Sequence, residues 1–96
     1  MIRAIFTHNR VTVDGHANHA PHGRDIVCAA ASALLYALIG ALEEQDNIQE
    51  LVVRPGHITV ASKKENRAEF ELIRCGLEQL AARYPRCVQV TENGGM

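Results

Sequence analysis

A histidine and a cysteine, two residue types that can act together in covalent catalysis, lie close together in the first third of the chain. His16 follows Gly15, and Cys28 comes 12 residues later, within an alanine-rich apolar stretch. A thiolate is a strong nucleophile, and a nearby imidazole can take the thiol proton and later pass it to a leaving amine. We therefore interpret Cys28 as a candidate nucleophile and His16 as its candidate general base.

The position of Cys28 near the start of a predicted helix favours this chemistry. Asp25 precedes the apolar stretch and belongs to the residue types that cap helices, so it predicts a helix that begins at about Ile26. Cys28 would then lie in the first turn, where unpaired amides and the helix dipole favour a thiolate. Ser32 falls one turn later on the same helix face, where its hydroxyl would reach a substrate or the sulfur.

The segment that joins the two residues is predicted to be a loop. Residues 14–24 include Gly15, Pro21 and Gly23, which are typical of turns and loops. Such a loop can fold back to bring the imidazole to the sulfur, and its glycines are expected to act as hinges. The backbone amide of Cys28, or a neighbouring amide at the helix start, is expected to help stabilise an oxyanion.

The other elements follow from hydrophobic patterns and turn residues. Strands are predicted at 2–6, 11–13, 50–53, 57–61 and 88–90, and helices at 26–44 and between Asn66 and Pro85. Asn66 and Glu69 resemble a capping box, and residues 91–96 are expected to fray. The order ββαββαβ predicts an α+β fold, a two-layer domain of residues 1–96 with both helices on one face of a mixed or antiparallel sheet.

Composition limits the classes of function. The 96 residues are 47% hydrophobic and 22% charged, and the formal net charge is -1, so we expect no direct binding to nucleic acid. Three cysteines without C-x-x-C spacing predict no disulfide framework and a reducing, cytoplasmic location. We expect no signal peptide and no membrane association, and we interpret Ile26 to Leu42 as a buried helix that is too short to span a bilayer.

Two segments together resemble the signature of one bacterial family. Gly15-His16-Ala17 is followed, after a short loop, by Asp25 to Leu34, which is Asp-Ile-Val-Cys-Ala-Ala-Ala-Ser-Ala-Leu. This pattern is similar to that of the ribosomal-processing cysteine proteases, and the rest of the chain resembles them more loosely. Two departures, the histidine-rich segment 18–22 and Ala31, leave the catalytic groups unchanged but bear on substrate preference.

The resemblance implies a function and a set of site residues. It implies a homodimeric, cytoplasmic cysteine endopeptidase that removes the N-terminal extension of a large-subunit ribosomal protein after an aromatic-rich stretch. It implies that Cys28 is the nucleophile and His16 the catalytic histidine. Asp25, Ser32 and Gly15 match supporting or substrate-binding positions, and no cofactor or metal is expected.

Metal binding is an alternative that the sequence leaves open. His16, His19 and His22 recur every three residues, with Cys28 nearby, and histidine and thiolate are good zinc ligands. The proline and glycine among them argue against a helix that would place all three histidines on one face. We therefore expect His19 and His22 to be exposed loop residues.

A non-enzymatic role is the other alternative. A cysteine between Val27 and Ala29 is often a small buried side chain without chemistry. The chain would then be a ribosome-associated dimeric scaffold, with the open sheet face or the alanine-rich helix surface buried between two copies. His57 is interpreted as the first residue of a strand, without an evident partner.

Overall fold

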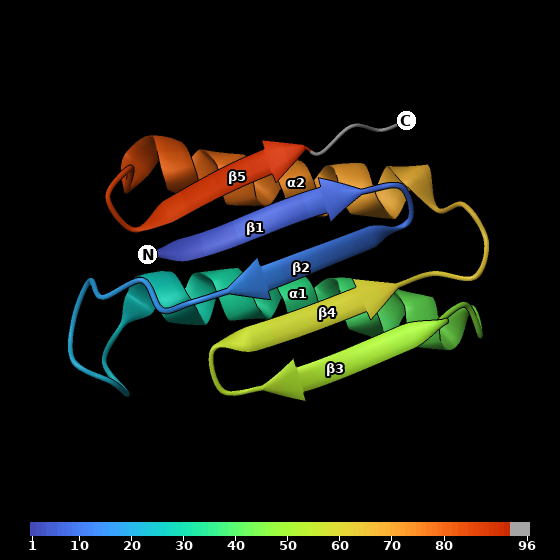
Figure 1. Cartoon of the computed structure of the whole chain (residues 1–96), viewed down its shortest axis with the longest axis horizontal. Coiled ribbons are helices and arrows are strands. Elements are labelled where there is room, and N and C mark those ends of the chain that lie inside the picture. The colour runs from blue at the N-terminus through green and yellow to red at the C-terminus, as the bar shows by residue number, and fades with distance from the viewer. Residues whose placement is uncertain (93–96) are drawn as a thin grey trace.

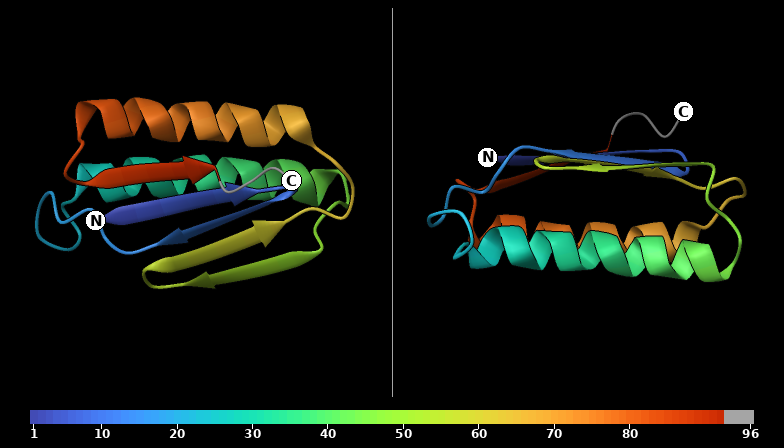
Figure 2. Two further views of the ribbon diagram at one scale, coloured as in Figure 1. Left: turned by 45° about the horizontal axis from the view of Figure 1, so that its top comes forward. Right: turned by 90° about the horizontal axis from the view of Figure 1, so that it is seen from below.

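A five-stranded sheet carries both helices on one of its faces (Figures 1 and 2). The computed structural model describes residues 1–92. Its elements are β1 (Ile2–Thr7), β2 (Arg10–Asp14), α1 (Ile26–Glu44), β3 (Glu50–Arg54), β4 (His57–Ala61), α2 (Arg67–Arg83) and β5 (Val88–Glu92). The predicted α+β fold, its element order and the placement of both helices on one face are confirmed.

The sheet is mixed, and its strand order is β3-β4-β2-β1-β5. β5 pairs with β1 in parallel, whereas the other neighbouring strands pair antiparallel. The parallel pair follows from the crossover through α2, which returns the chain beside β1 (Figure 1). Thr91 and Glu92 belong to β5, so they do not fray as expected, and the rest of the predicted tail, 93–96, lies outside the described residues.

The core lies between the sheet and the helices. In β1, Ile2, Ala4 and Phe6 are buried while the residues between them are exposed, as expected for a strand with one face against a core. The helices supply the other side, including Leu38 of α1 and Leu77 of α2, both fully buried. Burying a side chain of this size contributes about 1.5–3 kcal/mol.

Helix α1 is apolar on nearly all sides. At 19 residues and a mean hydropathy of 2.0, it is long and apolar enough to cross a membrane by length and composition, so the expectation that it is too short was wrong. In this fold one side of α1 packs into the core. From Ile26 to Ala37 its outward side is exposed and uncharged, and includes Ile26, Ala29, Ala33 and Ala37, whereas the exposed Glu44 follows on this side at the end of the helix. We call these four residues the outer face of α1.

Helix α2 approaches α1 closely. A Cβ atom added at Gly76 would lie 3.0 Å from Leu34 of α1, so glycine sets the close approach between the two helices. Asn66 precedes α2, but its side chain makes no hydrogen bond to the helix amides, so the predicted capping box is wrong. The position of α2 therefore depends on packing, with Phe70 and Ile73 buried against the core.

Two leucines of α2 provide a test of this packing. Leu77 is 0% exposed and Leu72 is 70% exposed. Leu77→Ala is expected to lower the free energy of unfolding by about 2–5 kcal/mol because it leaves a cavity, whereas Leu72→Ala is expected to change it by no more than about 0.5 kcal/mol. Urea unfolding followed by circular dichroism measures both. Equal losses in the two variants would contradict the placement of α2.

Candidate active site

Asp25 fixes the start of α1 and thereby the position of Cys28. One carboxylate oxygen, Oδ1, accepts hydrogen bonds from the backbone N–H groups of Val27 and Cys28, both at 3.0 Å. These are two of the amides that a helix leaves without an internal partner. The predictions that Asp25 caps the helix and that Cys28 lies in its first turn are confirmed.

The other oxygen of the same carboxylate holds the preceding loop. Asp25 Oδ2 accepts hydrogen bonds from the N–H groups of His19, at 2.9 Å, and Ala20, at 3.3 Å. Burial tends to raise the pKa of Asp25, but the four amides, of which that of Cys28 has the largest effect, together hold this pKa below its ordinary value of 3.8. The ionised carboxylate therefore joins the loop to the helix.

The sulfur of Cys28 contacts the backbone next to His16. The Ala17 N–H donates a hydrogen bond to Cys28 Sγ at 3.2 Å, and the Ala17 side chain is buried. An ionised acceptor strengthens such a bond. The loop thus folds back onto the helix start, and the residue after His16 is fixed against the sulfur.

The ring of His16 rests on the turn between β3 and β4. A Cβ atom added at Gly56 would lie 2.9 Å from His16 Nε2, so the ring packs directly over this glycine. The Gly15 N–H donates to the Gly56 carbonyl oxygen at 2.9 Å. A Cβ atom at Gly15 would lie 2.2 Å from the Met1 carbonyl oxygen, so this position has no room for a side chain. That the loop glycines act as hinges stays a prediction.

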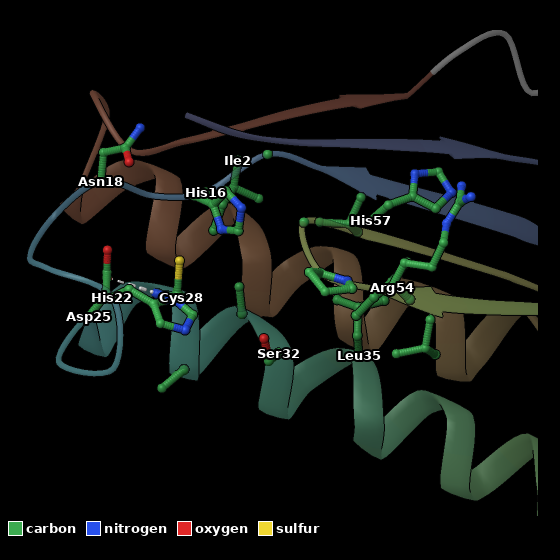
Figure 3. A pocket seen from close by; sticks show the side chains of 18 of the residues that line it. Ile2, His16, Asn18, His22, Asp25, Cys28, Ser32, Leu35, Arg54 and His57 are labelled. Atoms are coloured by element: carbon green, nitrogen blue, oxygen red, sulfur yellow. Dashed lines mark hydrogen bonds between the residues drawn. The ribbon is translucent and has the colours of Figure 1, made fainter.

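One pocket brings the two candidate residues together. In Figure 3 the Cys28 sulfur points from α1 into this pocket, and the His16 ring enters it from the end of β2. Within residues 1–92 no hydrogen bond joins the His16 ring to the sulfur. The pocket has a volume of about 820 Å³, and Ser32 lines its wall one turn after Cys28, as predicted.

The pocket continues as an apolar groove between α1 and the β3–β4 hairpin. Leu35 and Tyr36 line it from the helix, and Val53 and Ile58 line it from the strands. Tyr36 is 54% exposed and Val53 is 45% exposed, so the groove presents apolar surface to solvent. The sequence did not locate this groove, because its two walls lie far apart along the chain.

The structure changes two expectations about the site. The Cys28 N–H donates to Asp25 Oδ1 and is therefore not free to hold an oxyanion in this arrangement. The alternative donor, a neighbouring amide at the helix start, stays a prediction. His57, for which no partner was expected, contacts two side chains. Its Nδ1 pairs with Asp14 Oδ1, and its Nε2 lies 3.0 Å from Thr59 Oγ1.

The histidines of the loop do not form a metal site. Across the described part of the chain, no three His, Cys, Asp or Glu side chains are grouped so that they could hold a metal ion. His19 instead meets the ring of Tyr84 edge to face, with 5.2 Å between the ring centroids, while His22 lines the pocket. The spacing of three residues therefore does not bring His16, His19 and His22 together.

The comparison with known families decides where the chain belongs. The model of a family described as Cysteine protease Prp matches residues 1–89. The chain belongs to this family. A Staphylococcus aureus protein named Ribosomal processing cysteine protease Prp is 42% identical over 67 residues, which cover 66% of this chain and 62% of that protein. The match thus spans less than two thirds of the length of that curated relative.

Solved structures share the fold over nearly the whole chain. The Staphylococcus aureus ribosomal processing protease Prp, in complex with a covalently linked product peptide, superposes with a TM-score of 0.85 at 25% identity. That match covers 97% of this chain and 100% of the other. A protein from Streptococcus mutans superposes with a TM-score of 0.78 at 30% identity, covering 96% and 93% of the two chains. These likenesses confirm the fold of the cysteine protease Prp family.

Replacing Asp25 tests its role in joining the loop to α1. Asp25→Ala is expected to lower the free energy of unfolding at pH 7 by about 0.5–2 kcal/mol, because it removes the helix cap. Asp25→Asn keeps one acceptor oxygen, so it is expected to lower the free energy of unfolding by less than Asp25→Ala does. The pKa of Asp25 is lower in the folded state than its ordinary value of 3.8. The stabilisation by the Asp25 carboxylate is therefore complete above pH 3.8, and it is lost as the pH falls through the folded-state pKa.

Urea unfolding of the wild type and both variants between pH 7 and pH 2 measures this difference. The difference in free energy of unfolding between the wild type and Asp25→Ala should become smaller below pH 3.8. A difference in free energy of unfolding that grows as the pH falls, or that is absent at pH 7, would contradict the role of Asp25 in joining the loop to α1.

Proposed function

We propose that the protein is a cysteine endopeptidase that removes the N-terminal extension of a large-subunit ribosomal protein, with Cys28 as nucleophile and His16 as general base. The observation that carries the proposal is that both side chains enter one pocket, with Cys28 in the first turn of α1. The name of the Staphylococcus aureus relative and its covalently linked product peptide support the reaction class. We assign the activity to one domain of residues 1–96 in the cytoplasm, where ribosomal proteins are made.

The reaction proceeds in two stages. In the first, His16 takes the Cys28 thiol proton, Sγ attacks the scissile carbonyl carbon, and the peptide C–N bond breaks as His16 gives its proton to the leaving amine. This stage leaves a thioester on Cys28. In the second, His16 removes a proton from water, the hydroxide attacks the thioester carbonyl carbon, and the C–S bond breaks to release the carboxylate product and restore the thiol.

The groups around the dyad hold the reacting atoms. The Ala17 N–H, 3.2 Å from Cys28 Sγ, stabilises negative charge on the sulfur before attack. Once the carbon–sulfur bond forms, the negative charge moves to the carbonyl oxygen of the substrate. We assign the Ala17 N–H, which contacts the sulfur, as the backbone donor to this oxygen. We assign Ser32, which lines the pocket wall, to a hydrogen bond with the substrate backbone.

The apolar groove suits the aromatic-rich segment of the substrate. The groove begins at Cys28 and runs past Tyr36 and Val53, so a peptide with its scissile bond at the sulfur would place neighbouring side chains there. Transfer of an aromatic side chain from water to such a surface is favourable, and Tyr36 offers an edge-to-face or stacked contact. Substrate preference is therefore assigned to the walls of this groove.

A homodimer is the second part of the proposal. The outer face of α1 exposes Ile26 and three alanines without a charged side chain. Small side chains let two helices approach closely, and an apolar helix face of this kind is otherwise left in water. We assign the contact between two copies to this face, which borders the pocket at Ala29, whereas Ile26, Ala33 and Ala37 do not line the pocket.

Substitution of the dyad tests the proposed mechanism. Cys28→Ala is expected to abolish cleavage because it removes the nucleophile, and His16→Ala is expected to lower kcat by about 10²–10⁴-fold because it removes the general base. The measurement is steady-state hydrolysis of a fluorogenic peptide that spans the extension of the ribosomal protein from the same organism.

Cys75→Ala is the matched control. Cys75 is an exposed, free cysteine on α2, so its loss should leave kcat unchanged. Cleavage at the wild-type rate by folded Cys28→Ala would exclude the proposed nucleophile, and the absence of cleavage by the wild type would exclude the proposed substrate.

A charge on the outer face of α1 tests the dimer. Ala33→Arg is expected to shift the protein from twice the chain mass to the chain mass in sedimentation equilibrium, because two guanidinium groups would be buried against each other. Ala82→Arg, at an exposed alanine of α2, should leave the dimer intact. A monomeric wild type, or a dimer that persists in Ala33→Arg, would exclude this face.

A further inference from the structure

A row of polar residues crosses the open face of the sheet at the end nearest the pocket. The register places Asp14 of β2 opposite His57 of β4, and His57 opposite Arg54 of β3. Their neighbours Val13 and Ile58 point to the helix side, so alternation places the row on the face without helices. In Figure 3 the His57 ring and the Arg54 side chain extend away from the Cys28 sulfur.

Both ring nitrogens of His57 have partners on this face. Nδ1 pairs with Asp14 Oδ1, and Nε2 lies 3.0 Å from the hydroxyl of Thr59. The side chain of His57 is 26% exposed and that of Asp14 is 55% exposed. Both ring nitrogens are therefore engaged with side chains of β2 and β4.

The pair joins the two segments that hold His16. Asp14 precedes Gly15 and His16, and His57 follows Gly56, on which the His16 ring rests. Between them, the Gly15 N–H donates to the Gly56 carbonyl oxygen at 2.9 Å. The backbone of His16 and the surface beneath its ring are therefore connected to each other by this side-chain pair.

We propose that Asp14 and His57 form a clamp that positions His16 against Cys28 from the opposite face of the sheet. The inference rests on the proposed protease function, in which His16 is the general base. His57 also belongs to the residues that line the pocket, but both of its ring nitrogens contact other side chains of the sheet, so we assign Asp14 and His57 a positioning role. A shift of about 1 Å in a catalytic group can lower a rate by about 100-fold, so a contact that only supports His16 can still control the chemical step.

His57→Ala breaks the clamp, and His57→Asn partly restores it. The amide nitrogen of asparagine stands near the place of Nδ1 and can donate to Asp14. His57→Ala is expected to lower kcat by about 10- to 100-fold with KM changed by less than about twofold, because in this proposal His57 acts on the position of His16 and not on substrate binding. His57→Asn should recover most of that loss, and Asp14→Ala/His57→Ala should be no slower than either single variant, since the two residues act as a unit.

An ion pair at the other end of the same strands provides the control. Arg10 and Glu50 contact each other at 2.6 Å on the same open face, opposite Ala61. Glu50→Ala removes this pair without altering the turn beneath His16, so kcat should stay at the wild-type value. An equal fall of kcat in Glu50→Ala would show that loss of any such pair slows the enzyme through general destabilisation, and would overturn the proposal.

A second measurement separates this proposal from the proposed substrate. The rate at which iodoacetamide alkylates Cys28 at pH 7, followed by mass spectrometry with the exposed Cys75 as internal reference, reports the coupling of His16 to the sulfur without any peptide. His16→Ala and His57→Ala should both lower this rate by a similar factor. If the wild type cleaves no peptide but both variants show this fall, the proposed function fails while the clamp stands.

The outcomes that overturn the clamp are specific. A His57→Ala protein with wild-type kcat and wild-type alkylation of Cys28 would overturn it, and so would a change in KM alone. If His57→Ala does not fold, Asp14→Ala removes the same contact by changing Asp14, the more exposed of the two residues. Its kcat and the rate of Cys28 alkylation then decide the test.

Discussion

The carboxylate of Asp25 is the interaction on which the arrangement of the pocket depends. One oxygen binds two amides of the first turn of α1, and the other binds two amides of the loop that follows His16. Buried amides without partners are costly, so a single ionised group that satisfies four of them fixes both segments together. The contact between the Ala17 N–H and the Cys28 sulfur follows from this attachment.

The pocket exists because the two layers of the fold supply different parts of it. Cys28 and Ser32 come from the helix layer, whereas His16 follows a strand and rests on Gly56 in the hairpin turn. Two helices cannot cover five strands evenly, and β3 at the edge of the sheet extends beyond α1 (Figure 2). The uncovered margin becomes the apolar groove that continues from the sulfur.

Helix α1 serves a different purpose on each of its sides. Its core side, with Leu38 and Leu42, contributes to folding, and the adjacent side presents Cys28 and Ser32 to the pocket. Its outer face carries small apolar side chains, which we assign to a second copy. This use of nearly every side explains why the helix has the composition of a membrane span while packing against a sheet.

The sequence by itself determined the elements and the local geometry around Cys28. Helix capping by Asp25 and the placement of Ser32 one turn after Cys28 depend on residues within one or two turns, so their patterns are visible in the chain. Only the tertiary structure decided the strand order, the packing of the His16 ring on Gly56, and the pairing of His57 with Asp14, which are 43 positions apart. Such contacts depend on the register between distant strands, which is set by packing of the whole sheet against the helices and leaves no local signal.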